Sequence, residues 1–187
     1  FSNLAPGSYQ MRIGAPPSAY PQAATPVVSL DNGVDDDSNG SQLNPGGAIT
    51  SPVIVLAANE TNHTVDFGLK ALVGVYSISG QVRDDYDLDG NFSDNDQPVG
   101  NVTVELYIDS DASGTFDPGI DALLRTTVTN GIGQYQFTSL PDGTYFVREI
   151  DPSPSNSTAD TDGPNDNLIK VTIFGASSTG NDFLDGV

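Results

Sequence analysis

The residues most able to do chemistry form an acidic loop near the middle of the chain. Asp85, Asp87 and Asp89 alternate with other residues, and Gly90 follows at once. Calcium-binding loops have this order, with oxygen ligands at positions 1, 3 and 5 and a glycine at position 6 for the sharp turn. Carboxylates that converge on one short loop repel one another unless a cation lies between them. The loop therefore predicts a Ca²⁺ site, with the expected ligands Asp85, Asp87, Asp89, Asn91, Ser93 and Asp96.

A second loop repeats this pattern less completely. Asp109, Asp111 and Ser113 occupy its first, third and fifth positions, and a glycine again stands sixth. The twelfth position holds Ile120 instead of an acid, which departs from the rule. The alternative for either loop is a solvated polar turn without a cation. We expect Ca²⁺ here as well, on Asp109, Asp111, Ser113, Thr115, Asp117 and Asp121.

Catalytic side chains other than carboxylates are scarce. The chain has no Cys, and hence no thiol nucleophile, and with the single His63 no His-based triad is evident. The 25 acids leave a carboxylate pair for glycoside hydrolysis open, but no apolar pocket that would raise the pKa of an acid is evident. We expect a protein that is not an enzyme.

The charge of the chain limits its partners. Six Lys and Arg stand against 25 Asp and Glu, for a formal net charge of -19. Such a chain cannot neutralise phosphates, so nucleic acid and anionic membrane surfaces are poor partners. No segment approaches the roughly 18 consecutive apolar residues of a membrane span, and we expect no membrane insertion. All but three of the acids are Asp, a residue that disfavours helix interiors and favours turns.

An internal repeat fixes the organisation of the chain. Residues 1–12 return as residues 137–148, with Phe, Leu, Gly, Tyr and Arg recurring in register. Each copy continues through an acidic stretch rich in Gly, Asn and Pro and then an apolar segment. A closing Asp-Phe pair follows at residues 66–67 and again at 182–183. The two copies predict tandem domains of one type.

The second copy has the pattern of an antiparallel β-sandwich. In residues 101–108, apolar Val102, Val104, Leu106 and Ile108 alternate with polar residues, so one face of this strand is buried and the other is wet. Turn residues separate short segments of this type, and no segment has a helical period. The seven expected strands lie near 75–83, 101–108, 123–129, 134–138, 143–150, 167–174 and 180–184.

The first copy contains only the last part of the same unit. Its expected strands lie near 8–13, 26–30, 51–57 and 64–68, and the N-terminal strands of the sandwich are missing. We therefore divide the chain into a truncated repeat, 1–72, and a complete seven-stranded repeat, 73–187. Either the missing strands precede this segment in a longer array, or a neighbouring subunit supplies them by strand addition and so builds a polymer.

Several motifs carry a family resemblance. The acidic run 85–90, the segment Pro-Val-Gly-Asn-Val-Thr-Val at 98–104 and the segment 133–145 occur in the order and spacing of serine-aspartate repeat protein B domains. The chain thus resembles SdrD B-like domains, which belong with the collagen-adhesin (Cna) B-type, prealbumin-like or Ig-like sandwiches. The resemblance covers residues 76 to 187 well, and residues 1 to 69 as a truncated copy. It implies a seven-stranded sandwich, calcium-dependent rigidity, and metal positions at Asp85, Asp87, Asp89 and Asp96.

The predicted function is structural. The resemblance implies an extracellular location at the cell surface and a role as a calcium-stiffened stalk or filament subunit, whose partners are copies of itself or neighbouring repeats. The alternative is an adhesin module that binds a protein or glycan ligand. Trp is absent and aromatic residues make up 8% of the chain, which weakens a sugar-stacking platform.

Overall fold

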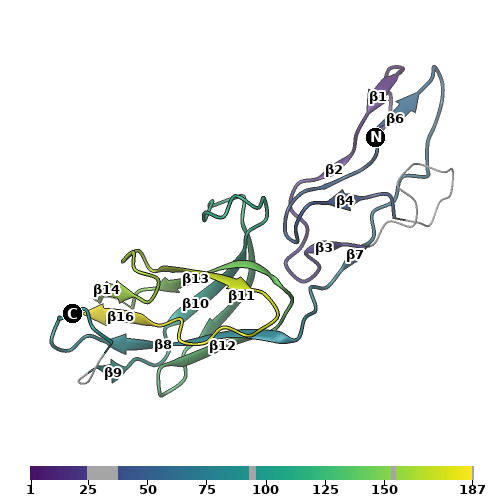
Figure 1. Cartoon of the computed structure of the whole chain (residues 1–187). Coiled ribbons are helices and arrows are strands. Elements are labelled where there is room, and N and C mark those ends of the chain that lie inside the picture. The colour runs from purple at the N-terminus through teal and green to yellow at the C-terminus, as the bar shows by residue number, and fades with distance from the viewer. Residues whose placement is uncertain (25–37, 93–95, 153–154, 187) are drawn as a thin grey trace. The chain divides into compact units, whose positions relative to one another are not determined.

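The computed structural model describes residues 1–24, 38–92, 96–152 and 155–186, and every regular element within these ranges is a β-strand. The chain forms two compact units, Phe1–Ala71 and Leu72–Val187 (Figure 1). The all-β fold expected from the sequence is confirmed. The strand expected near 26–30 lies outside the described residues.

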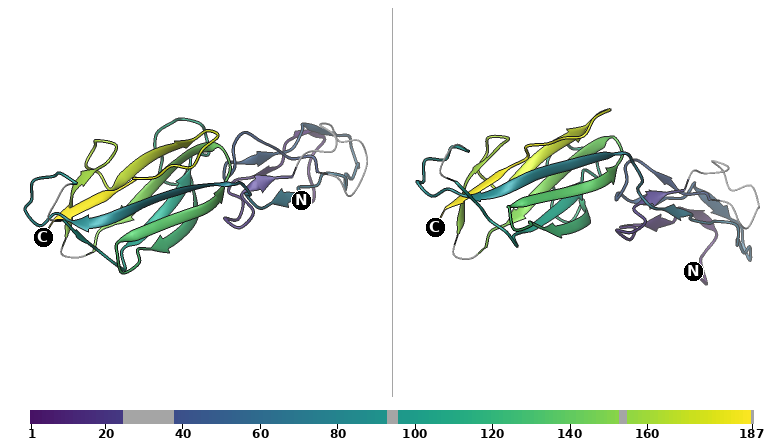
Figure 2. Two further views of the ribbon diagram at one scale, coloured as in Figure 1. Left: turned by 60° about the horizontal axis from the view of Figure 1, so that its bottom comes forward. Right: turned by 90° about the horizontal axis from the view of Figure 1, so that it is seen from below.

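The second unit is a sandwich of two sheets that lie face to face (Figure 2). The first sheet has the order β11 (Ala122–Val128), β10 (Thr103–Ile108), β13 (Gly143–Ile150) and β15 (Leu168–Ile173). The second has the order β12 (Gln134–Leu140), β8 (Tyr76–Asp84), β16 (Phe183–Gly186) and β14 (Asn156–Asp160), with β9 (Gln97–Pro98) also on β8. Among these named strands only β16 and β8 pair in parallel; the other pairs are antiparallel.

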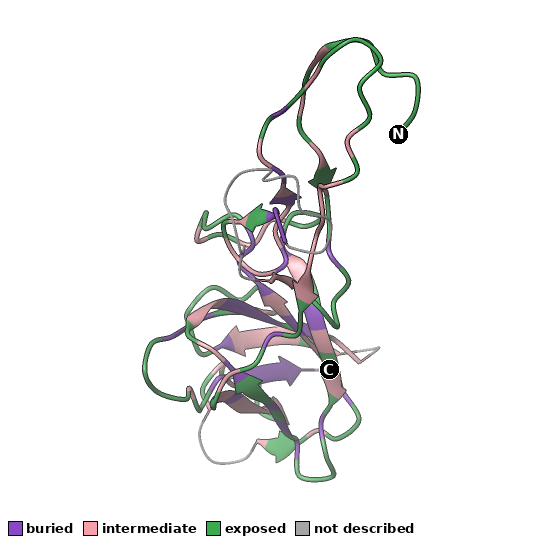
Figure 3. Ribbon diagram, turned by 90° about the vertical axis from the view of Figure 1, so that its right-hand side faces the viewer, coloured by how far each residue is buried: buried purple, intermediate pink, exposed green. Residues whose placement is uncertain are grey.

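Alternation of apolar and polar residues determines which side chains enter the space between the sheets. In β10, Val104 and Leu106 are fully buried, whereas Thr103, Glu105 and Tyr107 are half-buried. Buried residues concentrate on the strands of the second unit and exposed ones on its loops (Figure 3). The core consists of Leu72, Ile78, Val82, Val102, Val104, Leu106, Ile108, Leu124, Tyr135, Phe137, Leu140, Tyr145, Val147, Ile169, Val171, Ile173 and Phe183.

The first unit has shorter strands arranged in three small sheets. These pair β1 (Gly7–Tyr9) with β6 (Ile54–Leu56), β2 (Arg12–Ile13) and β4 (Ser41–Gln42) with β5 (Ile49–Thr50), and β3 (Gln22–Ala23) with β7 (Leu69–Lys70). The strand expected near 64–68 begins only at residue 69, because the backbone N–H groups of Asp66 and Gly68 donate to the side chains of Asn39 and Ser38.

The repeated sequence segments make the same contacts in both units. The Tyr9 hydroxyl donates to the Ala5 carbonyl at 2.6 Å, and the Tyr145 hydroxyl donates to the Pro141 carbonyl at 3.0 Å. Each tyrosine lies on a strand that pairs with the later apolar strand of its own unit, β1 with β6 and β13 with β15. In the second unit β13 also pairs with β10 on its other side, whereas β1 pairs only with β6 within the described residues.

Candidate metal centres

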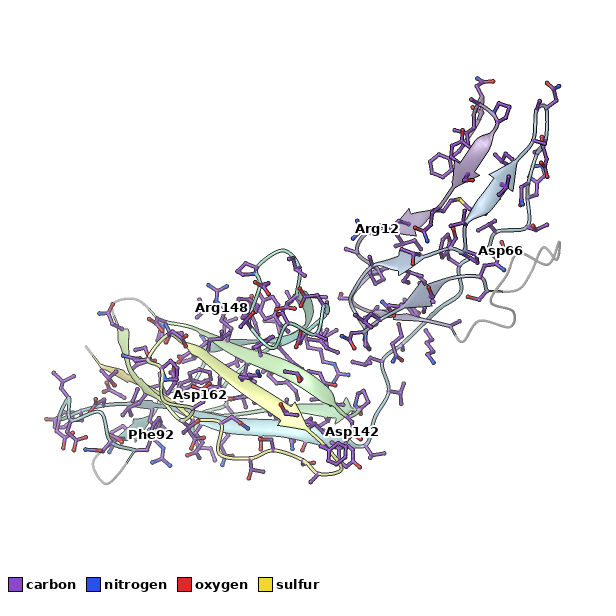
Figure 4. All side chains as sticks on the ribbon, turned by 45° about the horizontal axis from the view of Figure 1, so that its top comes forward. Arg12, Asp66, Phe92, Asp142, Arg148 and Asp162 are labelled. Carbon is purple, nitrogen blue, oxygen red and sulfur yellow. The ribbon has the colours of Figure 1, made fainter. Side chains whose placement is uncertain are left out.

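The first acidic loop begins directly after β8 with Asp85. The two carboxylate oxygens of Asp85 accept the backbone N–H groups of Asp89 and Gly90, each at 3.1 Å. Leu88 and Gly90 have φ values of 58° and 70°, the left-handed conformation that turns the loop back on itself. Figure 4 labels Phe92, which belongs to this loop.

This turn brings three of the predicted ligands together. Carboxylate oxygens of Asp85, Asp87 and Asp89 lie within 4.8 Å of one another. Calcium binds oxygen at 2.3–2.6 Å, so two ligands of one ion are separated by up to about 5 Å. Asp85 is buried and the other two are exposed, so the cluster opens to solvent on one side. The spacing suits one cation held by all three carboxylates.

Two other predicted ligands of this loop, Asn91 and Asp96, interact with the clustered acids. Asn91 donates its side-chain and backbone N–H groups to Asp89, and these bonds lower the pKa of that carboxyl. Burial raises the pKa of Asp96, and the charges of Asp85 and Asp87 raise it further. The negative charges of the cluster therefore act on Asp96, although Asp96 is not one of its three acids. Ser93 lies outside the described residues.

The second loop forms the same turn from a different sequence. Asp109 follows β10, and its two carboxylate oxygens accept the N–H groups of Ser113 at 3.1 Å and Gly114 at 3.0 Å. Ala112 and Gly114 have φ values of 60° and 74°. Ala112 and Gly114 stand three and five positions after Asp109. Leu88 and Gly90 stand at the same distances from Asp85 in the first loop. The two loops thus share one backbone geometry.

The second loop also collects three carboxylates. Oxygens of Asp109, Asp111 and Asp121 lie within 4.8 Å of one another. Asp121 is fixed from both sides, since its oxygens accept the N–H groups of Ser110 at 2.9 Å and Asp117 at 2.8 Å. Burial raises the pKa of Asp121, whereas the N–H of Ser113 lowers the pKa of Asp111.

The remaining predicted ligands of the second loop bond to one another. The hydroxyls of Ser113 and Thr115 donate to Asp117 at 2.9 and 3.2 Å. Asp117 therefore lies beside the three clustered acids without joining them. Lys170 from β15 donates its ammonium group to the carbonyl of Gly114 at 2.5 Å and ties the loop to the sheet.

A third acidic cluster was not expected from the sequence. Carboxylate oxygens of Glu149, Asp151 and Asp185 lie within 4.8 Å of one another. Burial and the charge of Asp185 raise the pKa of Glu149 to about 9, and burial raises the pKa of Asp185 to about 6. Glu149 interrupts an otherwise apolar inward-facing row with Tyr145 and Val147, and that interruption is the signal that the sequence offered.

Two facing sheets around an apolar core, with carboxylate clusters where the strands end, define a β-sandwich module whose acidic loops have the donor atoms for a cation. The described residues include no helix that is long and apolar enough to cross a membrane. The family model of the SdrD B-like domain matches residues 76–170, about half of the chain, so the chain belongs to the SdrD B-like domain family. The resemblance seen in the motifs is confirmed.

Curated relatives agree with this assignment. The chain is 28% identical over 181 residues to serine-aspartate repeat-containing protein F of Staphylococcus epidermidis. The aligned region covers 92% of this chain and 10% of that protein. It is 27% identical over 180 residues to serine-aspartate repeat-containing protein D of Staphylococcus aureus, where the aligned region covers 96% of this chain and 12% of that protein. The chain spans about a tenth of the length of these relatives. The family is one of structural repeats of cell-surface proteins rather than enzymes, and places the chain outside the cell.

Two pilins are among the solved structures that the chain matches. The minor pilin GBS52 of Streptococcus agalactiae matches with a TM-score of 0.40 and 15% identity, over 76% of this chain and 65% of that one. The major pilin subunit BcpA of Bacillus cereus matches with a TM-score of 0.35 and 17% identity, over 74% and 42%.

Proposed function

We propose that this chain is a calcium-stiffened spacer of a cell-surface fibre. The observation that carries the proposal is that one carboxylate-capped turn occurs twice in the second unit. Each copy brings three carboxylates within 4.8 Å, and each connects two strands of the sandwich. The two loops differ in sequence, yet they share the same hydrogen bonds and the same left-handed positions. This repetition supports a common role more strongly than a chance gathering of acids on a polar surface would.

A cation in either loop would act as a clamp. Two carboxylates about 5 Å apart repel by roughly 3 kcal/mol at an effective dielectric constant near 20. A divalent cation would replace this repulsion with attraction and link the buried leading Asp of each loop to two acids further along it. The strand end and the tip of the loop then move as one body, which is the property a spacer under tension requires.

Substitution of one exposed acid in each loop tests this clamp. We expect Asp87→Asn and Asp111→Asn each to weaken one calcium site strongly, because each removes one of the three carboxylate charges and leaves only a neutral ligand oxygen. The calcium-free fold should stay intact, because neither side chain packs in the core. A site held at ten to one hundred times its dissociation constant contributes about 1.4 to 2.7 kcal/mol, so each variant should lose roughly that much calcium-dependent stability. Thermal unfolding with calcium and with chelator measures the loss.

Asp142→Asn is the matched control for these two variants. Asp142 is exposed, belongs to none of the three clusters, and accepts the N–H of Gly175 through an oxygen that Asn also offers (Figure 4). Its calcium-dependent stabilisation should equal that of the unsubstituted chain. Equal stabilisation in all three variants would contradict the clamp.

The first unit supports a second element of the proposal, assembly by strand pairing. Within the described residues β1 has a partner on one side only, whereas its counterpart β13 has partners on both. On the paired strand β6, Val55 is 69% exposed, and Val53 just before it is 64% exposed. Unpaired edges beside exposed apolar side chains favour addition of a strand. The occupant that we propose is a strand of a neighbouring repeat or of a second copy of this chain.

Sedimentation velocity over a range of protein concentrations, in calcium, tests pairing between copies. We expect dimers or longer assemblies that increase with concentration. A chain that stays monomeric at the highest concentration would contradict pairing between separate copies and leave β1 to a strand of the same polypeptide.

A further inference from the structure

We propose that the free edge of β1 accepts a strand with the residue pattern of β10, antiparallel and in the register that β10 has on β13. This inference rests on the strand pairing proposed above and names the occupant. The occupant is an extended segment of a neighbouring repeat with aliphatic residues at alternate positions, as in Val104, Leu106 and Ile108 of β10. Strand addition takes its affinity from backbone hydrogen bonds and its specificity from alternate side chains.

The two units place corresponding residues in one register. Tyr9 lies opposite Ile54 where β1 pairs with β6 (Figure 1). Tyr145 lies opposite Val171 where β13 pairs with β15, and the neighbouring residues keep this correspondence. β1 is therefore the counterpart of β13, and β6 is the counterpart of β15. In the second unit the other side of β13 pairs with β10, which identifies the type of strand that suits the free side of β1.

The backbone of β1 presents alternate residues to β6 and to the free edge. The Met11 carbonyl accepts the N–H of Ser51 at 2.9 Å, so Met11 faces the chain that leads into β6. Tyr9 stands two residues earlier and faces the same way. Ser8 and Gln10 alternate with these residues, so their N–H and carbonyl groups face the free edge.

The counterpart of Ser8 shows what an added strand would supply. Thr144 on β13 corresponds to Ser8, and its carbonyl accepts the N–H of Asp109 at 3.0 Å. Asp109 directly follows β10, so this bond belongs to the edge that β10 occupies. A strand added to β1 in the same register would give the Ser8 carbonyl the same donor.

The inward-facing side chains of β1 have less cover than those of β13. Tyr145 lies opposite Ile108 of β10 and is fully buried. Tyr9 and Met11, which share one face of the chain, are only half-buried. Aliphatic side chains at alternate positions of an added strand would lie beside these two residues and remove apolar surface from water.

The edge strand β15 carries side-chain caps that β1 lacks. The N–H of Lys170 donates to Asp162 at 3.0 Å, and the N–H of Leu168 donates to Asp166 at 3.2 Å. Side chains that cap an edge in this way oppose pairing with another strand. Among the described residues, no side chain caps the backbone of Ser8. The edge of β1 is therefore open to a strand where the edge of β15 is closed.

Binding of a peptide to the whole chain tests the inference. The probe is a labelled peptide of residues 101–109, Asn-Val-Thr-Val-Glu-Leu-Tyr-Ile-Asp. We expect saturable binding by fluorescence anisotropy. The control peptide has Glu105 and Leu106 exchanged, which breaks the alternation and places a charge beside apolar side chains. It should bind about tenfold more weakly or worse.

Ser8→Pro and Val55→Pro locate the peptide on the molecule. These residues lie opposite each other, and the N–H of each faces away from the β1–β6 pair. Proline is tolerated on an edge whose N–H faces solvent, so both variants should keep this pair. We expect Ser8→Pro to weaken peptide binding about tenfold and Val55→Pro to leave it unchanged. The counterpart of β6 is β15, whose outer side has no strand within the described residues. Equal affinities of the two variants would overturn the inference.

Hydrogen exchange of the unsubstituted chain decides the matter if Ser8→Pro does not fold. Bound peptide should slow exchange of the N–H groups of Ser8 and Gln10 and leave that of Val55 unchanged. Exchange that the peptide does not alter at Ser8 or Gln10 would refute the inference.

These tests do not involve the acidic loops. A chain that ignores calcium would end the spacer proposal, and peptide binding at β1 would still stand. Copies that associate in sedimentation while the peptide fails to bind would leave strand pairing in place and exclude a strand of the β10 type as its occupant.

Discussion

Removal of calcium should lower the melting temperature of the second unit by roughly 10 °C or more. Two loop sites that are well occupied in millimolar calcium together contribute about 3 to 5 kcal/mol. For a domain of about 100 residues, 1 kcal/mol corresponds to roughly 4 °C or more. The effect arises because the carboxylates of each loop repel one another once the ion has left. Calorimetry in calcium and in chelator measures the difference directly.

The double variant Asp87→Asn with Asp111→Asn is the control for this result. Its melting temperature should respond much less to chelator, because both loops have lost a carboxylate charge while their leading acids still accept the backbone N–H groups that form the turns. An unchanged melting temperature of the unsubstituted chain in chelator would mean that the loops are solvated turns. The proposal of a calcium-stiffened spacer would then fail.

The substitution Phe183→Ala should lower the free energy of unfolding of the second unit by about 3 to 5 kcal/mol, the usual cost of Phe→Ala in a core. Phe183 is fully buried on β16, between β8 and β14, and its ring lies 6.3 Å from that of Tyr135. Its loss leaves a cavity beside an inner strand of the second sheet. Urea unfolding followed by circular dichroism gives the change in the free energy of unfolding.

Phe174→Ala is the matched comparison. Phe174 is 87% exposed just after β15, so the same truncation removes little buried surface and should change the free energy of unfolding by less than about 0.5 kcal/mol. Equal effects of the two substitutions would show that β16 is not an integral strand of the sandwich.

The sequence predicted the local features of the fold better than the distant ones. The expected strand at 101–108 is found as β10, because alternation with a period of two is a property of neighbouring residues. Strand β14 was missed because Asn156–Asp160 is polar and acquires its extended form only by pairing with β16. The parallel pairing of β16 with β8 depends on where the chain returns and has no local signal.

The candidate sites divide in the same way. Both loop clusters could be predicted because their acids lie within thirteen consecutive residues and share a glycine that permits the turn. In the second loop, Asp121 joins the clustered acids and Asp117 does not. The position of Asp121 depends on the two backbone N–H groups that bond to its carboxylate, which the sequence pattern does not reveal. The Glu149 cluster joins residues from two strands far apart in the chain, so spacing alone could not reveal it.

The most direct test of the central claim is a crystal structure of the chain grown in calcium, with anomalous scattering used to locate the ions. The account predicts one calcium ion among Asp85, Asp87 and Asp89, and another among Asp109, Asp111 and Asp121. Both loops should keep the hydrogen bonds of their leading acids. Ordered loops without an ion in millimolar calcium would contradict the account.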